Sequence, residues 1–177
     1  MQKVTSKPNT INITKRDAAK SITTDVIKHL REKTHAGIMD AKRALEESHG
    51  DMKKAEEWIR QKGMQRAEKK AGNEAKQGMI ASYIHQGSQV VAMVELNCET
   101  DFVARNEKFV TLGKEIAMQI ASMKPTSVVE LLNQPYIRNP DTSIKNLVKE
   151  TAGTLGENIV VARFTRMAVG ESAVPTQ

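Results

Sequence analysis

The chain has 177 residues and a mass of 19.6 kDa, which suits one domain or a small module joined to a larger one. Apolar residues make up 39% of the chain, but no stretch approaches the ~18 apolar residues of a membrane span, so we expect no membrane-spanning segment. The single cysteine, Cys98, excludes an intramolecular disulfide framework and favours a reducing compartment, and we therefore expect a soluble, cytoplasmic protein.

The net charge of +6 is concentrated in two segments. Residues 1–20 carry five basic side chains against one acidic side chain, and residues 60–76 carry six against two. The rest of the chain is therefore slightly acidic, unlike the evenly basic body of a typical nucleic-acid-binding domain. The pattern predicts a basic tail and a basic linker.

The first third of the chain predicts a tail followed by a small helical module. Residues 1–22 are polar and lack periodicity, which indicates a flexible tail. Apolar residues spaced three and four apart predict three short helices within residues 23–63. The expected limits of these helices are Thr23 to Gly37, Asp40 to Gly50 and Asp51 to Gly63. Such a bundle has a very small core and is typical of a docking module.

The remaining residues predict a mixed core. Residues 64–76 are a charged linker with helical propensity, residues 77–170 alternate between strand and helix patterns, and residues 171–177 are a C-terminal tail. The expected elements are a hairpin (79–84 and 90–96), helices (106–122, 128–132 and 144–151), a Pro-bounded loop (135–140) and a last strand (159–164). We predict an α+β fold, in which a three-helix, ubiquitin-associated-like bundle precedes a three-stranded antiparallel sheet packed with helices.

No motif for catalysis, metal binding or cofactor binding stands out. Both glycine-rich phosphate-binding patterns are absent, and the G-x-x-G at Gly153 to Gly156 is interpreted as a helix terminator. The four histidines show neither i, i+4 pairing nor a neighbouring cysteine pair, which disfavours a metal site. Cys98 is expected to be a buried or half-buried thiol rather than a nucleophile. We therefore expect no enzyme, no catalytic residue, no metal and no cofactor.

One segment of the chain is unusual for a strand-to-helix connection, because it places an aromatic ring beside a carboxylate. It reads Thr100-Asp101-Phe102-Val103-Ala104-Arg105-Asn106. In one interpretation Asp101 caps the following helix and Phe102 packs on the core, and composition alone favours this. In the other, the Asp-Phe pair is an exposed tip that is presented to a partner, as aromatic anchors often are.

Together with Val94 to Cys98, this segment resembles a signature of the translation elongation factor Ts family. Residues 30–45 are similar to the family's R-x-x-T-G-A-G-M-M-D-C-K-x-A-L pattern. Shorter matching stretches lie at residues 69–73, 133–137 and 156–159. The resemblance covers about residues 24–170 and is to the short form, which has a single core subdomain.

The resemblance implies a guanine-nucleotide exchange factor that binds elongation factor Tu in its GDP-bound and nucleotide-free forms. It would promote GDP release, and then GTP rebinding, by disturbing the Mg²⁺ and nucleotide site of the partner. The residues implied for this step are Thr100, Asp101, Phe102 and Val103, with the Phe102 ring wedged between partner helices. The residues implied for docking of the small module are Arg31, Thr34, Gly37, Met39, Asp40 and Lys42.

The sheet also predicts an assembly. A three-stranded sheet with an apolar open face is expected to pair with its copy, giving a homodimer and a 2:2 complex with elongation factor Tu. Either the alternating Val160, Ala162 and Phe164 or the matching face of the 90–96 strand would supply the contact.

A basic nucleic-acid-binding adaptor with a ubiquitin-associated-like module stays open as the alternative function. The acidic balance outside the tail and linker argues against it, so neither a specific nucleic acid nor a membrane is expected as a partner.

Overall fold

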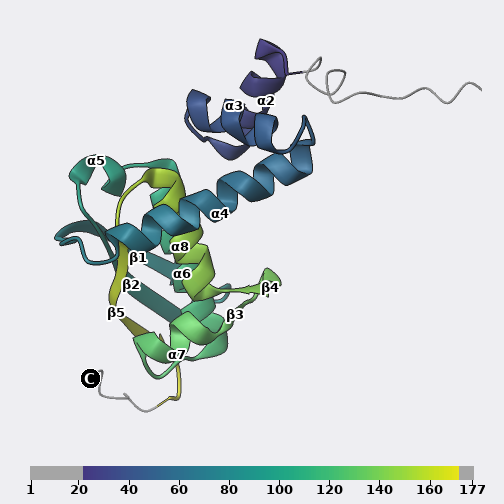
Figure 1. The fold of residues 1–177 in the computed structure, drawn as a ribbon. Coiled ribbons are helices and arrows are strands. Elements are labelled where there is room, and N and C mark those ends of the chain that lie inside the picture. The colour runs from purple at the N-terminus through teal and green to yellow at the C-terminus, as the bar shows by residue number, and fades with distance from the viewer. Residues whose placement is uncertain (1–21, 172–177) are drawn as a thin grey trace, which may run out of the picture. The chain divides into compact units, whose positions relative to one another are not determined.

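The computed structural model describes residues 22–171, which divide into two compact units, one ending at Ile59 and one beginning at Arg60 (Figure 1). Each unit has its own apolar core. The tails expected at residues 1–22 and 171–177 fall almost wholly outside the described residues. Within the described range, every helix is too short or too polar to cross a membrane.

The first unit is built from α2 (Thr24–Thr34), α3 (Ile38–Glu47) and the beginning of α4 (Met52–Lys70). Its α2 ends earlier than expected, because His35 adopts a left-handed conformation, and Gly37 is the residue before α3 rather than the end of α2. The fully buried side chains of the unit are Leu30, Ala41, Ala44, Leu45 and Ala55. A core made largely of alanine brings the helices close together but buries little apolar area. The ubiquitin-associated-like character of this unit stays a prediction.

The third helix does not end at Gly63, as the sequence suggested, but continues to Lys70. The first residues of the expected linker are therefore the last turns of α4, and the side chain of Ala67 joins the core of the second unit. There α4 crosses α8 (Ile144–Leu155), and the two backbones meet at Gly63 and Gly153. A Cβ atom added to Gly153 would lie 2.3 Å from the carbonyl carbon of Gly63, so this crossing requires glycine at position 153. Gly63 therefore marks a close helix crossing, not a helix end.

The second unit contains the predicted three-stranded antiparallel sheet, in the order β1-β2-β5. The strands are β1 (Gln77–Ile84), β2 (Val90–Cys98) and β5 (Ile159–Ala168). Helix α6 (Glu107–Met123) packs across β1 and β2 with the apolar face that its periodicity predicted. The remaining elements are α5 (Asp101–Ala104), α7 (Val128–Asn133), α8 and a hairpin of β3 (Pro135–Tyr136) and β4 (Asn139–Ser143), where a loop was expected. The fold is α+β, as predicted.

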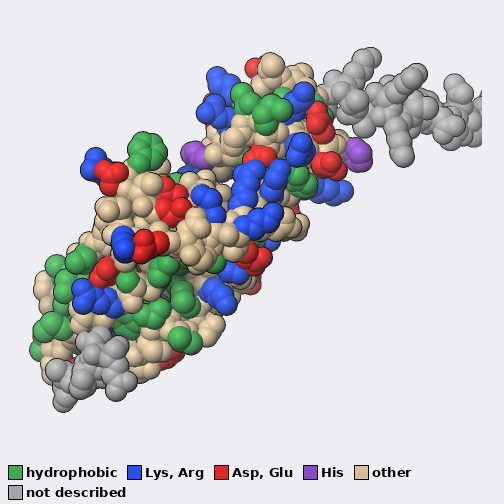
Figure 2. Space-filling model, turned by 60° about the vertical axis from the view of Figure 1, so that its left-hand side comes forward, with side chains coloured by type: hydrophobic (Ala, Val, Ile, Leu, Met, Phe, Trp, Pro, Cys, Tyr) green, Lys and Arg blue, Asp and Glu red, His purple; other side chains and the backbone are tan. Residues whose placement is uncertain are grey.

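The sheet face opposite α6 remains exposed. Its most exposed apolar side chains are Ile80, Ile84, Met93, Val160 and Met167, all at least 40% exposed. Hydrophobic side chains also gather on the visible face of this unit in Figure 2. The expectation that Val160, Ala162 and Phe164 share one face is wrong, because Ala162 forms a bulge. Beyond the bulge Phe164 lies opposite the buried Val94 and packs on the core, since one extra residue reverses the side-chain alternation.

Candidate functional site

The short helix α5 follows directly from β2 and forms an exposed tip, which we define as residues Thr100 to Ala104. Thr100 is its N-cap, and the Thr100 hydroxyl accepts a hydrogen bond from the Val103 backbone N–H at 3.4 Å. One interpretation of the sequence required Asp101 to cap the helix, but Asp101 does not do so. Its carboxylate instead accepts a hydrogen bond from the Arg105 guanidinium at 2.8 Å, and both side chains are exposed.

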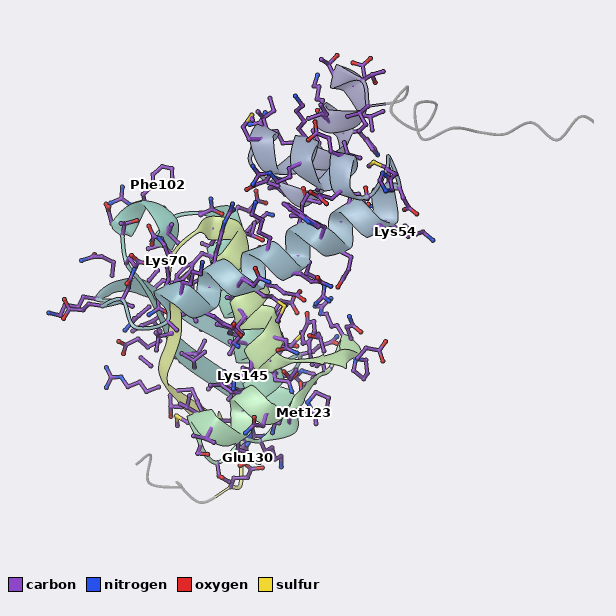
Figure 3. All side chains as sticks on the ribbon, in the orientation of Figure 1. Lys54, Lys70, Phe102, Met123, Glu130 and Lys145 are labelled. Carbon is purple, nitrogen blue, oxygen red and sulfur yellow. The ribbon has the colours of Figure 1, made fainter. Side chains whose placement is uncertain are left out.

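Phe102 and Val103 point in opposite directions from the tip. The Phe102 side chain is 79% exposed, whereas Val103 is 4% exposed and belongs to the core. Figure 3 shows the Phe102 ring projecting from α5 into the surroundings. The interpretation that Phe102 packs on the core is therefore wrong, and the exposed-tip interpretation describes its position. Val103, one of the expected partner-binding residues, has its side chain in the core beneath the tip.

The backbone below the tip is held by two carboxylates from different parts of the chain. The Glu157 carboxylate accepts hydrogen bonds from the backbone N–H groups of Glu99 and Thr100 at 3.1 and 3.0 Å. It also accepts from the Thr100 hydroxyl at 2.6 Å. The Glu99 carboxylate in turn accepts from the Asn158 backbone N–H at 2.7 Å. Each carboxylate therefore satisfies backbone donors on the neighbouring segment.

The end of α4 and the loop after it add further contacts to the Glu99 carboxylate and to the segment that contains Glu157. Asn73 donates through its amide to the Glu99 carboxylate at 3.0 Å, and the Lys70 ammonium lies 3.7 Å from the same carboxylate. The Asn158 amide donates to the Asn73 backbone carbonyl at 2.7 Å, and Lys70 donates to the Gly156 carbonyl. The Asn158 N–H and then the Asn73 amide are the main causes that hold the pKa of Glu99 below its usual value.

Three of the sequence stretches that carry the family resemblance thus meet at the tip. They are residues 69–73, 94–106 and 156–159. Sequence reasoning assigned a role only to the middle one and missed Glu99, Glu157 and Asn158. Nothing in the local sequence shows that Glu157 reaches Thr100, which is 57 positions away.

Two other expectations for this region agree with the structure. Cys98 is a buried thiol, which donates to the Thr100 carbonyl at 3.1 Å, and burial raises its pKa. Gly156 adopts the left-handed conformation that ends α8. Across residues 22–171, no group of three His, Cys, Asp or Glu side chains is placed to hold a metal ion.

In the first unit the expected docking residues differ in what they present. Met39 is 71% exposed. Its neighbour Ile38, which the sequence analysis did not select, is 59% exposed. The two side chains form an exposed apolar pair at the beginning of α3, directly after Gly37, where nothing lies within 4 Å of an added Cβ. Exposed apolar side chains on a small module are typical of docking surfaces.

The polar docking candidates lie on either side of this pair in the sequence. Arg31 and Lys42 are exposed, and Lys42 lies 3.8 Å from the Glu46 carboxylate. Thr34 has a local structural role, because its hydroxyl donates to the Leu30 carbonyl at 2.7 Å at the end of α2. Asp40 is half-buried in the first turn of α3.

Comparison with known proteins connects this geometry to a family. A family model described as "Elongation factor TS" matches residues 99–176, which include the tip, Glu157 and Asn158. Proteins named Elongation factor Ts from Synechococcus elongatus and Thermodesulfovibrio yellowstonii are each 43% identical to this chain over 196 residues. The alignments cover 85% and 86% of this chain and 89% and 98% of those proteins. A protein of the same name from Nitratidesulfovibrio vulgaris is 40% identical over 195 residues, which cover 85% of this chain and 98% of that protein.

The chain belongs to the elongation factor Ts family. The resemblance found in the sequence is thereby confirmed, and the chain is a translation elongation factor of protein biosynthesis. These alignments are longer than the 177 residues of the chain itself. The elongation factor Ts relatives therefore carry internal residues that have no counterpart here.

Proposed function

We propose that this elongation factor Ts family member is a guanine-nucleotide exchange factor for elongation factor Tu. It binds the GDP-bound form, promotes GDP release and leaves a nucleotide-free complex to which GTP binds. The observation that carries the proposal is the exposed Phe102 ring on a tip whose first backbone N–H is hydrogen-bonded to the Glu157 carboxylate. A large aromatic side chain that is mostly exposed is available as an anchor for a partner.

The proposed mechanism is thermodynamic coupling and involves no covalent chemistry. A factor that binds the nucleotide-free partner more tightly than the GDP form must weaken GDP binding by the same ratio. Nucleotide and Mg²⁺ hold the GTPase site jointly, so a ring inserted beside the metal shell weakens both. For this reason the proposal needs no catalytic residue, metal or cofactor in the chain itself.

Each residue of the tip has a distinct part in the proposal. Phe102 is the wedge, and Asp101 engages polar groups beside it on the partner. The exposed ion pair between Asp101 and Arg105 contributes little to stability and is readily exchanged for a partner contact. Thr100 and Val103 keep the turn in place through the cap and the core.

A second contact is proposed for the first unit. Met39, together with Ile38, would pack on the GTPase domain of elongation factor Tu. The polar residues proposed to surround this contact are Arg31, Thr34, Gly37, Asp40 and Lys42. The site of action proposed for the complex is the cytoplasm.

The open face of the sheet supports the proposal of a homodimer, and hence of a 2:2 complex. Exposed apolar side chains on all three strands form a surface that a second copy could cover. Because Phe164 faces the core, the contact would come from the face that includes Met93 and Val160.

The test of the proposed function is the release of labelled GDP from elongation factor Tu. The full chain should accelerate release in a concentration-dependent and saturable manner. An unlabelled GDP chase without the factor gives the spontaneous rate. Release that stays at the spontaneous rate at saturating factor would contradict the proposal.

A further inference from the structure

We propose that Glu157 is a positioning residue for nucleotide exchange, which holds the tip in its binding conformation before the partner arrives. Glu157 and Glu99 form a pair of crossed carboxylates, which we call the clamp. The inference rests on the proposed exchange function and deepens it, because it adds a residue that need not touch the partner at all.

The clamp continues the β2–β5 pairing beyond its last backbone pair. That ladder ends where Cys98 lies opposite Ile159. Past this point, the backbone N–H groups of Glu99 and Thr100 are taken up by the Glu157 side chain, and the N–H of Asn158 by the Glu99 side chain. Carboxylates that accept backbone N–H groups make charge-assisted hydrogen bonds, which are stronger than neutral ones. The two segments are therefore held together up to the first residue of the tip.

The Thr100 hydroxyl transmits this restraint to Phe102. It donates to Glu157 at 2.6 Å and accepts from the Val103 N–H at 3.4 Å, so Glu157 sets the orientation of the helix cap. The residue whose side chain must be aimed, Phe102, lies between the two residues that this hydroxyl connects. A change at Glu157 therefore acts on the ring through two hydrogen bonds.

The tip needs such external support. Helix α5 has only four residues, and a single helical turn is not stable by itself. The Phe102 ring is 79% exposed and contributes little packing that could order the tip. A tip that is ordered before binding avoids the entropy that would otherwise be lost when the partner binds.

The clamp is itself braced at its other end. Asn73 and Lys70 hold the Glu99 carboxylate, and the Asn158 amide donates to the backbone of the same loop. Figure 3 places Lys70 near the end of α4, on the same side of the unit as Phe102. Glu157 is the member of this network that contacts the tip with both of its oxygens.

Two substitutions at Glu157 separate geometry from charge. Glu157→Ala removes all three acceptor contacts. Glu157→Gln can keep them, because its carbonyl oxygen can accept from both backbone N–H groups while its NH₂ group donates to the Thr100 hydroxyl. That hydroxyl retains a lone pair for the Val103 N–H. Glu68→Ala is the matched control, since it removes an exposed carboxylate of the same unit, paired with Lys149.

The first experiment measures GDP release from elongation factor Tu with the full-length variants. We expect Glu157→Ala to lower stimulated release roughly 5-fold, and no more than Phe102→Ala does, since a positioning residue cannot lose more than the group it positions. Glu157→Gln should stay within about 2-fold of the unmodified chain, and Glu68→Ala should match it. In a Phe102→Ala background, Glu157→Ala should cause no further loss.

The second experiment measures amide hydrogen exchange in the free chain by nuclear magnetic resonance. In Glu157→Ala the amides of Glu99, Thr100 and Val103 should exchange on the order of 10-fold faster, while amides of the β-sheet stay unchanged. A uniform acceleration would mean general destabilisation and would overturn the inference. Losses that add in the Phe102→Ala background would overturn it as well.

The outcomes for clamp and function can be told apart. If the unmodified chain does not accelerate GDP release, the proposed function fails and the positioning role fails with it. If the unmodified chain is active but Glu157→Ala is equally active, only the clamp inference fails. The hydrogen exchange result reports the ordering of the tip without any partner.

Discussion

At the scale of single residues, substitution of Phe102 should affect partner binding without affecting folding. Its ring is exposed, so Phe102→Ala should leave the melting temperature nearly unchanged. The same substitution should lower stimulated GDP release ~10-fold or more, because an aromatic anchor typically contributes ~2 kcal/mol. Both quantities can be measured on one preparation, by thermal unfolding and by release of labelled GDP.

Val103→Ala is the matched control for this experiment. It removes two buried methyl groups at the residue that follows Phe102 and should lower the unfolding free energy by about 2 kcal/mol. If Phe102→Ala instead lowers the melting temperature and leaves stimulated GDP release per folded molecule unchanged, the ring is a structural element and the wedge is refuted.

Asp101→Ala should show a milder form of the Phe102 effect. The exposed ion pair with Arg105 contributes only about 0–1 kcal/mol, so stability should be preserved. Loss of a peripheral carboxylate should reduce stimulated release less than loss of the ring. Arg105→Ala, measured in the same GDP-release assay, shows whether the effect passes through the ion pair. A loss at Asp101 larger than that at Phe102 would contradict the assignment of the wedge.

At the scale of helices and strands, the crossing of α4 and α8 predicts different effects on stability for alanine at its two glycines. Gly153→Ala would bring its Cβ to 2.3 Å from the Gly63 backbone, and the helices must separate at a cost of about 1–3 kcal/mol. Gly63→Ala meets its nearest neighbour at an ordinary 3.5 Å, and alanine is favoured over glycine within a helix by ~1 kcal/mol. It should be neutral or stabilising.

Urea unfolding of the two variants measures this difference directly. A Gly153→Ala variant as stable as the unmodified chain would show that the α4–α8 crossing is not as close as the structure has it.

At the scale of the whole molecule, acid should destabilise the second unit. Hydrogen bonds, ion pairs or both hold the pKa values of Glu95, Glu99, Glu130 and Glu171 below their usual range. In the unfolded chain such carboxyl groups titrate near about 4.3, so the unfolded state takes up protons first as the pH falls. The stabilisation is complete above about pH 5.5 and is lost as the pH falls through the lowered pKa values of the folded state.

Urea midpoints at pH 7 and at acidic pH measure this loss. Glu99→Gln, which cannot titrate, should show a shallower dependence on pH than the unmodified chain. A midpoint that does not change with pH would contradict the linkage.

The open sheet face gives a prediction about assembly. Sedimentation at micromolar concentration should show a dimer, and Met93→Lys should convert it to a monomer, because a charge in the middle of an apolar interface is costly to bury. Met93 is partly exposed, so the monomer should remain folded, as judged by thermal unfolding. A monomer of the unmodified chain at every concentration tested would refute the dimer.

Apart from the short α5 and the β3–β4 hairpin, which it did not predict, the sequence by itself determined the order of the main helices and strands, the antiparallel hairpin, the inward face of α6 and the family. These features rest on local periodicity and on motifs, which the chain carries wherever its parts lie. The resemblance also pointed to the tip, although composition alone favoured a buried Phe102, because a large apolar residue beside a strand is usually buried.

Only the tertiary structure decided the features that depend on contacts between distant segments. Gly63 looks like a helix end in the sequence, and only the structure shows that it lies within α4, where it meets Gly153 of α8. The bulge at Ala162, which turns Phe164 to the core, depends on the register with β2. In the sequence Glu157 is only a polar residue that follows a helix. The fold places its carboxylate within hydrogen-bond distance of Thr100. A hydrogen bond between residues so far apart has no local signal, since it exists only after the sheet has set the two segments side by side.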